Sequence, residues 1–352
     1  MKTTFLSTSS LSVATRLSLI KTQAKLAEAQ KEVTTGRLAD VGASLGYKTG
    51  QTISLRQDYS RLKTIIDTNS VVSTRLSATQ AALKSLSDDA QLFVSQLIGA
   101  RNTDSGPTVV QAQAKAALTS FTNTINTALD GAHLFAGINA DVKPLTDYYR
   151  NPTAPNRQAV ADAFLGSFAT TTSDPAIENI SAGDMQAFLD SQFATLFDDP
   201  AWTTNWSAAS GQNVKSRISS SELIETSTNA NNAGIRKLAE AFAMVADLGV
   251  ENLNQAAYQA VVDTATRMAG EAVQDLAKEQ ARLGTAQERV KSANERMSIQ
   301  IDIMTNHISL LEGVDPYEAS TRVSALMTQV ETAYAMTARL QNLSLLKYLP
   351  VA

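Results

Sequence analysis

Residues 55–97 read LRQDYSRLKTIIDTNSVVSTRLSATQAALKSLSDDAQLFVSQL. Mainly apolar residues recur in this stretch at spacings close to three and four. They are Leu55, Leu62, Ile65, Asn69, Val72, Leu76, Thr79, Leu83, Leu86, Ala90, Phe93 and Leu97. Spacing of this kind over about six heptads is typical of a long helix that packs along a partner helix. The stretch therefore predicts a coiled-coil-like helix, in which the polar Asn69 either fixes the register or is tolerated near solvent.

Further helices are predicted on both sides of a different middle segment. Pro107 suits the first turn of a helix that carries one apolar face as far as Ala132 and forms an antiparallel hairpin with residues 55–97. A second very long helix is expected from about Leu253 to Glu312. Its apolar residues again alternate at three and four, with one doubled four that relaxes supercoiling locally. This helix is the expected partner of residues 55–97.

The two ends of the chain carry narrower apolar seams, rich in small residues. The N-terminal seam consists of Leu6, Val13, Leu17, Ile20, Ala24, Ala27 and Leu38. The C-terminal seam consists of Val323, Leu326, Val330, Ala333, Thr337 and Leu340. The first helix should end near Gly36, and the glycines within residues 39–50 indicate a loop. Asp315-Pro316 with Glu318 predicts a capping box at the start of the last helix.

Residues 140–231 differ from the flanking segments in composition. They hold five of the eight prolines, nine of the 20 aromatic residues and both tryptophans. They also carry five basic and eleven acidic side chains, whereas residues 1–37 carry six and two. We expect a small mixed α/β domain with an aromatic core, inserted between the two long helices.

The order of these segments predicts the fold class. The chain should be mainly α, an elongated rod of long coiled-coil helices built from paired N- and C-terminal segments. The expected terminal helical assembly domain comprises residues 1–38 and 314–352. The helical rod domain comprises residues 39–139 and 232–313, and the variable outer domain comprises residues 140–231.

The terminal seams should gain order from neighbouring subunits. Seams of alanine, serine and threonine bury little apolar surface, so they offset only part of the entropy lost on ordering two helices. A stable intramolecular coiled coil is the simpler alternative. The expected assembly interface consists of Leu6, Val13, Leu17, Ile20, Val323, Leu326, Val330, Leu340, Leu345 and Tyr348.

Composition excludes several functional classes. The chain has no cysteine, which removes disulfides, thiolate metal sites and cysteine nucleophiles. Its two histidines are far apart in the sequence, so no metal or other cofactor is expected. A net charge of −4 gives no reason to expect nucleic acid as a partner. No apolar run predicts a membrane span or a cleaved signal peptide.

One enzyme motif occurs in the sequence. Gly42-Ala43-Ser44-Leu45-Gly46 matches the nucleophile elbow of α/β-hydrolases. That motif needs a buried strand before the serine, whereas here the end of a helix precedes it. We therefore interpret the segment as a flexible glycine loop and expect no enzyme activity and no catalytic residues.

The ends of the chain resemble the flagellin family. Gly131-Ala132-His133-Leu134-Phe135-Ala136-Gly137 is similar to the family's Gly-x-Tyr-Leu-Phe-Ala-Gly segment, with His133 at the aromatic position. Thr34-Thr35-Gly36-Arg37 resembles its Ser-Ser-Gly-Arg helix end. The run from Leu343 to Leu349 is closer to the family's hook-associated junction proteins than to flagellin. The resemblance covers about residues 1–139 and 232–349.

This resemblance implies a structural subunit of the bacterial flagellum at the junction of hook and filament, with a minor flagellin as the alternative. It implies an extracellular location, reached by flagellar type III export without a cleaved signal peptide. The implied partners are other copies of the chain in a ring, the other hook-associated junction protein, flagellin and an export chaperone. No nucleic acid and no membrane are implied.

Overall fold

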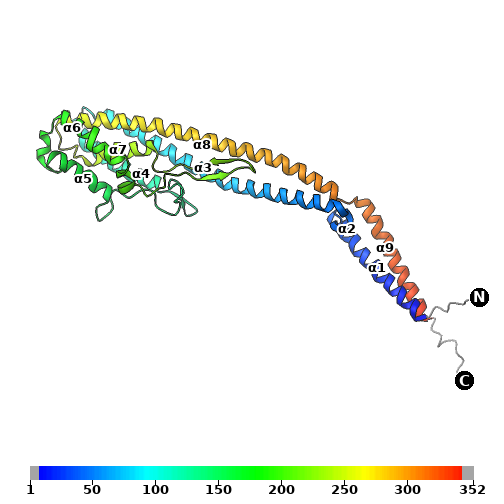
Figure 1. The fold of residues 1–352 in the computed structure, drawn as a ribbon. Helices are drawn as coiled ribbons and strands as arrows, with labels where there is room; N and C mark the ends of the chain where they lie inside the picture. Colours follow the sequence, from blue (N-terminus) through cyan, green and yellow to red (C-terminus); the bar gives the residue numbers. More distant parts are fainter. Residues whose placement is uncertain (1–7, 343–352) are drawn as a thin grey trace, which may run out of the picture. The chain divides into compact units, whose positions relative to one another are not determined.

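The computed structural model describes residues 8–342, which fall into two compact units (Figure 1). Unit 1 comprises Met1–Lys63 and Ser298–Ala352, and unit 2 comprises Thr64–Met297. Two long helices, α3 (Thr49–Ala100) and α8 (Gln255–Glu312), contribute to both units. Both helices were predicted from the apolar spacing, and their presence is confirmed.

Unit 1 is built around two terminal helices, α1 (Thr8–Thr35) and α9 (Pro316–Asn342), which pack against each other. Helix α1 ends at Gly36, whose φ of +66° is readily adopted only by glycine. The loop predicted over residues 39–50 is wrong. Asp40 accepts a hydrogen bond from the Ala43 amide at 2.9 Å and starts the short helix α2 (Val41–Leu45), which η1 (Gly46–Lys48) connects to α3.

Helix α9 starts as predicted, but only half of the predicted capping box forms. The Asp315 carboxylate accepts a hydrogen bond from the Tyr317 amide at 2.8 Å, and Pro316 occupies the first turn. The Glu318 carboxylate pairs with Arg322, one turn further along, at 2.8 Å. An ion pair within the helix has replaced the reciprocal cap.

In unit 2, α3 and α8 run antiparallel, as hydrogen bonds at successive levels show. Gln80 donates to the Gln280 carbonyl at 2.7 Å, and Tyr258 donates to the Ala100 carbonyl at 3.1 Å. Asn69 is fully buried, and its amide donates to Asn294 at 2.7 Å and to the Ile218 carbonyl at 2.8 Å. Asn69 is therefore a buried interhelical residue, not a tolerated flaw near solvent.

Two shorter helices of unit 2 lie on either side of the middle segment in the sequence. Helix α4 (Gly106–Ile125) packs against α7 (Ala233–Asp247). The prediction that the first of these continues to Ala132 is wrong, because the chain turns into a hairpin of β1 (Ala128–Leu129) and β2 (Ala132–His133). Asp130 and Gly131 form the turn with φ of 51° and 79°, as expected for Asp-Gly between two strands.

The middle segment consists of short elements. They are α5 (Pro155–Phe168), η2 (Pro175–Asn179), α6 (Ala182–Phe188), η3 (Leu189–Phe193), η4 (Ala194–Phe197), η5 (Trp202–Trp206) and the antiparallel pair β3 (Lys215–Arg217) and β4 (Leu223–Glu225). A continuous series of ring contacts runs from Phe164 to Trp206 and Tyr148, with centroid separations between 5.1 and 5.9 Å along Phe188, Phe193 and Phe197. The predicted aromatic core is thus present.

The fold is mainly α, with long paired helices and a small mixed insertion, as predicted. The predicted division into three domains at residues 38, 139, 231 and 313 stays a prediction. The two compact units divide the chain at other positions. No helix among residues 8–342 is both long and apolar enough to span a bilayer.

Candidate functional site: the terminal helix pair

The interface between α1 and α9 is narrow and only partly covered. On α9 the half-buried residues are Val323, Leu326, Val330, Ala333 and Thr337, which are five of the six residues of the predicted seam. Among the side chains of α1 that the structure describes, the half-buried or buried ones are Thr15, Leu19, Thr22, Leu26, Ala29 and Glu32. The α1 seam predicted from the sequence is therefore wrong for this interface, because the structure uses the opposite face of the helix.

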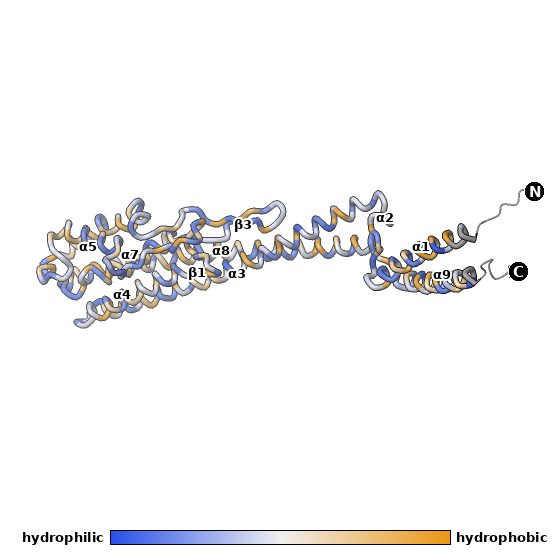
Figure 2. Tube along the Cα trace, turned by 90° about the horizontal axis from the view of Figure 1, so that it is seen from below, coloured by the Kyte–Doolittle hydropathy of each residue, from blue (hydrophilic) through white to orange (hydrophobic). Residues whose placement is uncertain are grey.

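The five residues of the predicted N-terminal seam from Val13 to Ala27 face solvent. Val13, Leu17 and Ile20 are 56, 54 and 51% exposed, and Ala24 and Ala27 are exposed as well. At about 100° per residue these five positions cluster about 180° from the face that meets α9. We call this set the outer stripe. Helix α1 thus carries apolar residues on two opposite faces, and orange and blue segments alternate along its tube in Figure 2.

Unit 1 exposes far more apolar surface than unit 2. Of the 21 exposed large hydrophobic side chains among the described residues, 13 lie in unit 1, although it contributes less than a third of those residues. Its buried apolar side chains, within the same described part, are Ala29, Leu62, Ile308 and Ala319. Large exposed apolar patches mark interaction surfaces. A unit with so small a core is suited to gaining its stability from neighbouring chains.

A polar cluster ties the ends of α1, α3, α8 and α9 together. Glu312 is 1% exposed and binds Arg56 through a bidentate ion pair, in which Nε lies 2.8 Å from Oε1. Glu32 pairs with Arg322 at 3.0 Å. The Leu38 amide donates to the Glu312 carbonyl at 2.9 Å, and the Val314 amide donates to the Gly36 carbonyl at 3.1 Å. Charged and backbone hydrogen bonds therefore hold the ends of these four helices together, where unit 1 has few buried apolar side chains.

The Arg56–Glu312 pair predicts a loss of order at low pH. The hydrogen bond from Arg56 lowers the pKa of Glu312 below its ordinary 4.5, so the pair contributes stability above that pH and loses it as the pH falls through the lower, folded value. We expect the protection factors of the Leu38 and Val314 amides to decrease when the pH is lowered below about 4.5. Protection factors are corrected for the pH dependence of intrinsic exchange. Hydrogen exchange read by NMR measures this.

An Arg56→Gln variant is expected to show the low protection already at pH 7. Arg61→Gln is the matched control, because it removes an exposed ion pair to Asp58 on the same helix, and such pairs contribute little. Equal protection in the wild type and in Arg56→Gln at pH 7 would contradict the assigned role.

The structure describes only some of the predicted interface residues. Leu6, Leu345 and Tyr348 lie outside the described residues, and Leu340 lies in α9 but its side chain is not described. Large exposed apolar residues on α9 that the seam pattern missed are Tyr317, Met327, Tyr334 and Met336. Tyr334 contacts α1, since its hydroxyl accepts a hydrogen bond from Gln23 at 2.6 Å.

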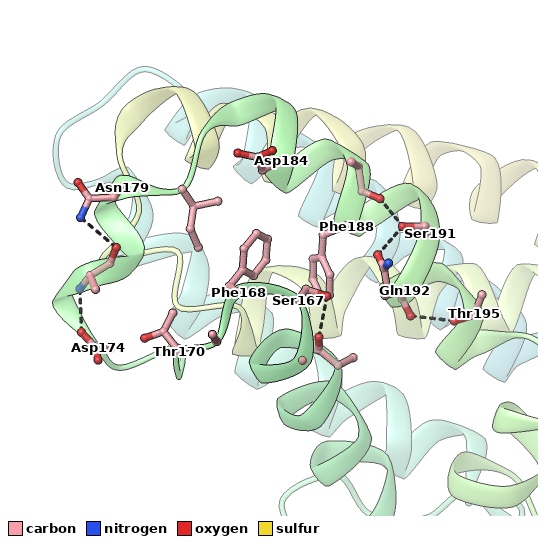
Figure 3. Close-up of a pocket in the computed structure, with 16 residues that line it drawn as sticks. Ser167, Phe168, Thr170, Asp174, Asn179, Asp184, Phe188, Ser191, Gln192 and Thr195 are labelled. Carbon is pink, nitrogen blue, oxygen red and sulfur yellow. Dashed lines mark hydrogen bonds between the residues drawn. The ribbon is translucent and has the colours of Figure 1, made fainter.

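A large cavity lies elsewhere, among α5, η2, α6 and η3 in unit 2 (Figure 3). Its two carboxylates are held by local hydrogen bonds: Asp174 accepts from the Ala176 amide at 2.8 Å, and Asp184 accepts from the hydroxyl of Ser181, the N-cap of α6, at 2.8 Å. These side chains are occupied in holding the local fold.

The other residues considered as candidates, Ser44, His133 and His307, lie in helices or in a hairpin. Ser44 lies within α2, so no strand precedes it as a nucleophile elbow requires. Within residues 8–342 no cluster of histidine and carboxylate side chains has the arrangement of a metal site. The His133 Nδ1 donates a hydrogen bond at 2.9 Å to the Asn126 carbonyl beside the β1–β2 hairpin, and His307 is exposed on α8.

Comparison with known proteins gives the family. Residues 6–140 match the profile of the bacterial flagellin N-terminal helical region, and residues 266–349 match that of the C-terminal helical region. A solved chain from Vibrio parahaemolyticus, provisionally assigned as a flagellar hook-associated protein, has a similar fold with a TM-score of 0.52. It is 10% identical in sequence, and the match covers 76% of this chain and 99% of that one. No curated protein sequence matches significantly.

The two family profiles together cover more than half of the sequence. The matched segments include α1 and α9, which pack against each other. The chain therefore belongs to the bacterial flagellin family and is a structural protein of the flagellum.

Proposed function

We propose that the chain is a hook-associated protein that forms the junction between the hook and the flagellin filament. The main observation in support is that α1 has apolar residues on two opposite faces. One apolar face meets α9, and the outer stripe is left exposed on a unit with almost no core of its own. A subunit built in this way needs neighbours to cover the outer stripe.

The proposed assembly interface combines the outer stripe with the chain ends. Val13, Leu17 and Ile20 contact neighbouring chains, whereas Val323, Leu326 and Val330 hold α9 against α1 and so present the stripe. Leu6, Leu340, Leu345 and Tyr348 extend the interface beyond the side chains described. The partners are further copies in a ring, the other hook-associated junction protein and flagellin. An export chaperone covers the same segments before assembly.

Two observations favour the junction over the alternative, a minor flagellin of the filament. The run from Leu343 to Leu349 resembles junction members of the family more than flagellin. The structurally similar Vibrio parahaemolyticus chain is provisionally assigned as a hook-associated protein. At 10% identity this likeness concerns the fold, and it is consistent with the proposal. The location would be extracellular, at the distal end of the hook, after export without a cleaved signal peptide.

A deletion strain tests the proposal. A junction subunit offers unlike surfaces to hook and filament, so its loss should leave complete hooks that release flagellin into the medium and cells that do not swim. Electron microscopy of the cells and immunoblots of the medium measure both effects. A strain that expresses the chain from a plasmid is the control. Long filaments on the hooks of the deletion strain would reject the junction and favour the minor flagellin.

A further inference from the structure

Helix α9 carries a second row of residues beside the seam that meets α1. Met327, Glu331, Tyr334 and Ala338 are all exposed, Met327 and Tyr334 by 52 and 53%, and they follow one another at spacings of four, three and four. At about 100° per residue they lie within about 60° of one another and about 90° from the centre of the seam. We call this row the α9 stripe. Heptad spacing of this kind suits a helix face that packs along another helix.

The outer stripe of α1 has the same periodicity. Its members, from Val13 to Ala27, are separated by four, three, four and three residues. Within one copy the outer stripe points away from α9, so the two stripes of that copy cannot meet each other. They can meet only between two copies of the chain.

The contacts between α1 and α9 within one copy set which of their residues lie at the same level. Tyr334 accepts a hydrogen bond from Gln23 at 2.6 Å, and Arg322 pairs with Glu32 at 3.0 Å, so the two helices run antiparallel. Counting along both helices from these two contacts gives the residues at equal level, which are Met327 with Ala27, Glu331 with Lys25, Tyr334 with Ala24 and Ala338 with Ile20.

These levels match large side chains with small ones when a second copy stands beside the first at the same height. Met327 and Tyr334 of one copy then meet alanines of the other, and Ala338 meets an isoleucine. Facing helices interdigitate without voids when large and small residues alternate across the contact in this way. The two stripes are therefore complementary in shape at four successive positions.

The charges of the two stripes favour the same arrangement. Glu331 and Lys25 are both exposed, and neither has an ion pair with another residue of the described chain. Lys21 and Glu28 lie on the same flank of α1 as Lys25, which leaves that flank with a net positive charge. Exposed pairs of this kind contribute little affinity, but they select the partner and the register.

We propose that the outer stripe of α1 in one copy packs against the α9 stripe of the next copy in the ring. This inference rests on the proposed function, since it takes the ring as given and names the surface that covers the outer stripe. The contact is heterologous, because each copy uses its two stripes with two different neighbours. It therefore extends from copy to copy, as a ring requires, instead of closing a pair.

Cysteine cross-linking tests the contact, and the chain has no cysteine of its own. Flagella are isolated from cells that express Ala27→Cys with Met327→Cys, treated with a short bismaleimide and analysed on a denaturing gel. A short reagent cannot join the two positions within one copy, because Ala27 points away from α9. We expect a ladder of dimers, trimers and larger products, because every copy carries both halves of the contact.

A matched control uses the opposite side of α9. Gln329 is exposed two residues beyond Met327, about 200° around the helix from it. Ala27→Cys with Gln329→Cys should give at least tenfold less ladder, and each single cysteine variant should stay monomeric. A ladder as strong in the control as in the Met327→Cys pair overturns the proposal, and so do products that stop at the dimer.

Charge reversal gives a second, independent measurement. Glu331→Lys should lower the yield of the ladder by about two- to fivefold at low salt and by less at high salt, and adding Lys25→Glu should restore it. If the cysteines prevent assembly, the same two charge variants in the cysteine-free chain are scored by the number of filaments per hook. Equal results for Glu331→Lys with and without Lys25→Glu contradict the contact.

The two proposals fail in different experiments. Monomer alone on the gel, from hooks that carry filaments, overturns the contact between the stripes and leaves the junction role in place. Long filaments on the hooks of the deletion strain reject the junction role, whereas a ladder from the same flagella would still support the contact.

Discussion

Cells that express Leu17→Asp in place of the wild type are expected to export the protein but to build no filaments. Leu17 is 54% exposed on the outer stripe, so the substitution leaves the α1–α9 interface intact in the monomer. In the assembly the same position would be covered by a neighbouring chain. An unpaired carboxylate buried there costs at least ~3 kcal/mol per subunit, which weakens each contact more than about 100-fold.

Two further variants make this experiment specific. Gln30→Asp adds the same charge to an exposed position on the flank of α1, and filaments should form normally. Leu326→Asp places the charge in the half-buried seam of α9, so it should disturb both the monomer and the assembly. Circular dichroism of the purified monomers should therefore show normal helix melting for Leu17→Asp, within about 0.5 kcal/mol, and reduced melting for Leu326→Asp.

Electron micrographs give the number of filaments per hook, and immunoblots of the medium show whether the variant is exported. Filaments at wild-type number with exported Leu17→Asp would show that the outer stripe is not an assembly surface. Such a result would leave the membership of the family untouched, because that rests on the two ends of the sequence.

Phe242→Ala is expected to destabilise unit 2 by about 4 kcal/mol. The ring is fully buried on α7 and makes edge-to-face contacts with Phe93 of α3 at 4.9 Å and Phe121 of α4 at 6.0 Å. Truncation removes apolar contacts with both helices and leaves a cavity, for which large-to-small core substitutions of phenylalanine cost ~3–5 kcal/mol. Phe242 therefore contributes to the packing of three helices, α3, α4 and α7, at once.

Urea denaturation followed by tryptophan fluorescence measures the effect within unit 2 alone, because both tryptophans of the chain, Trp202 and Trp206, belong to that unit. The transition midpoint should fall without a change in the slope of the transition. Leu92→Ala is the control, since Leu92 is 58% exposed on α3 and should change stability by less than about 0.5 kcal/mol. A shift in Phe242→Ala no larger than that of the control would contradict the assigned packing.

Local signals in the sequence predicted most elements correctly. The alternating spacing identified α3 and α8, because a long helix repeats the same local pattern many times. Asp315 and Pro316 identified the start of α9. The hairpin at Asp130-Gly131 was missed although the dipeptide favours it, because the apolar spacing continued past it to Ala132. Similarly, the glycines near Asp40 suggested a loop where the Asp40 cap forms a short helix.

The sequence by itself determined which residues of α1 are apolar and at what spacing, because helical periodicity is a property of neighbouring residues along the chain. Only the tertiary structure decided which of the two faces of α1 meets α9. Leu19 and Leu26 lie on one face and Leu17 and Ile20 on the other, with similar spacing and similar apolar character. The choice depends on the geometry at Gly36 and Gly313, where the Arg56–Glu312 pair and the crossing backbone hydrogen bonds set the direction of both helices.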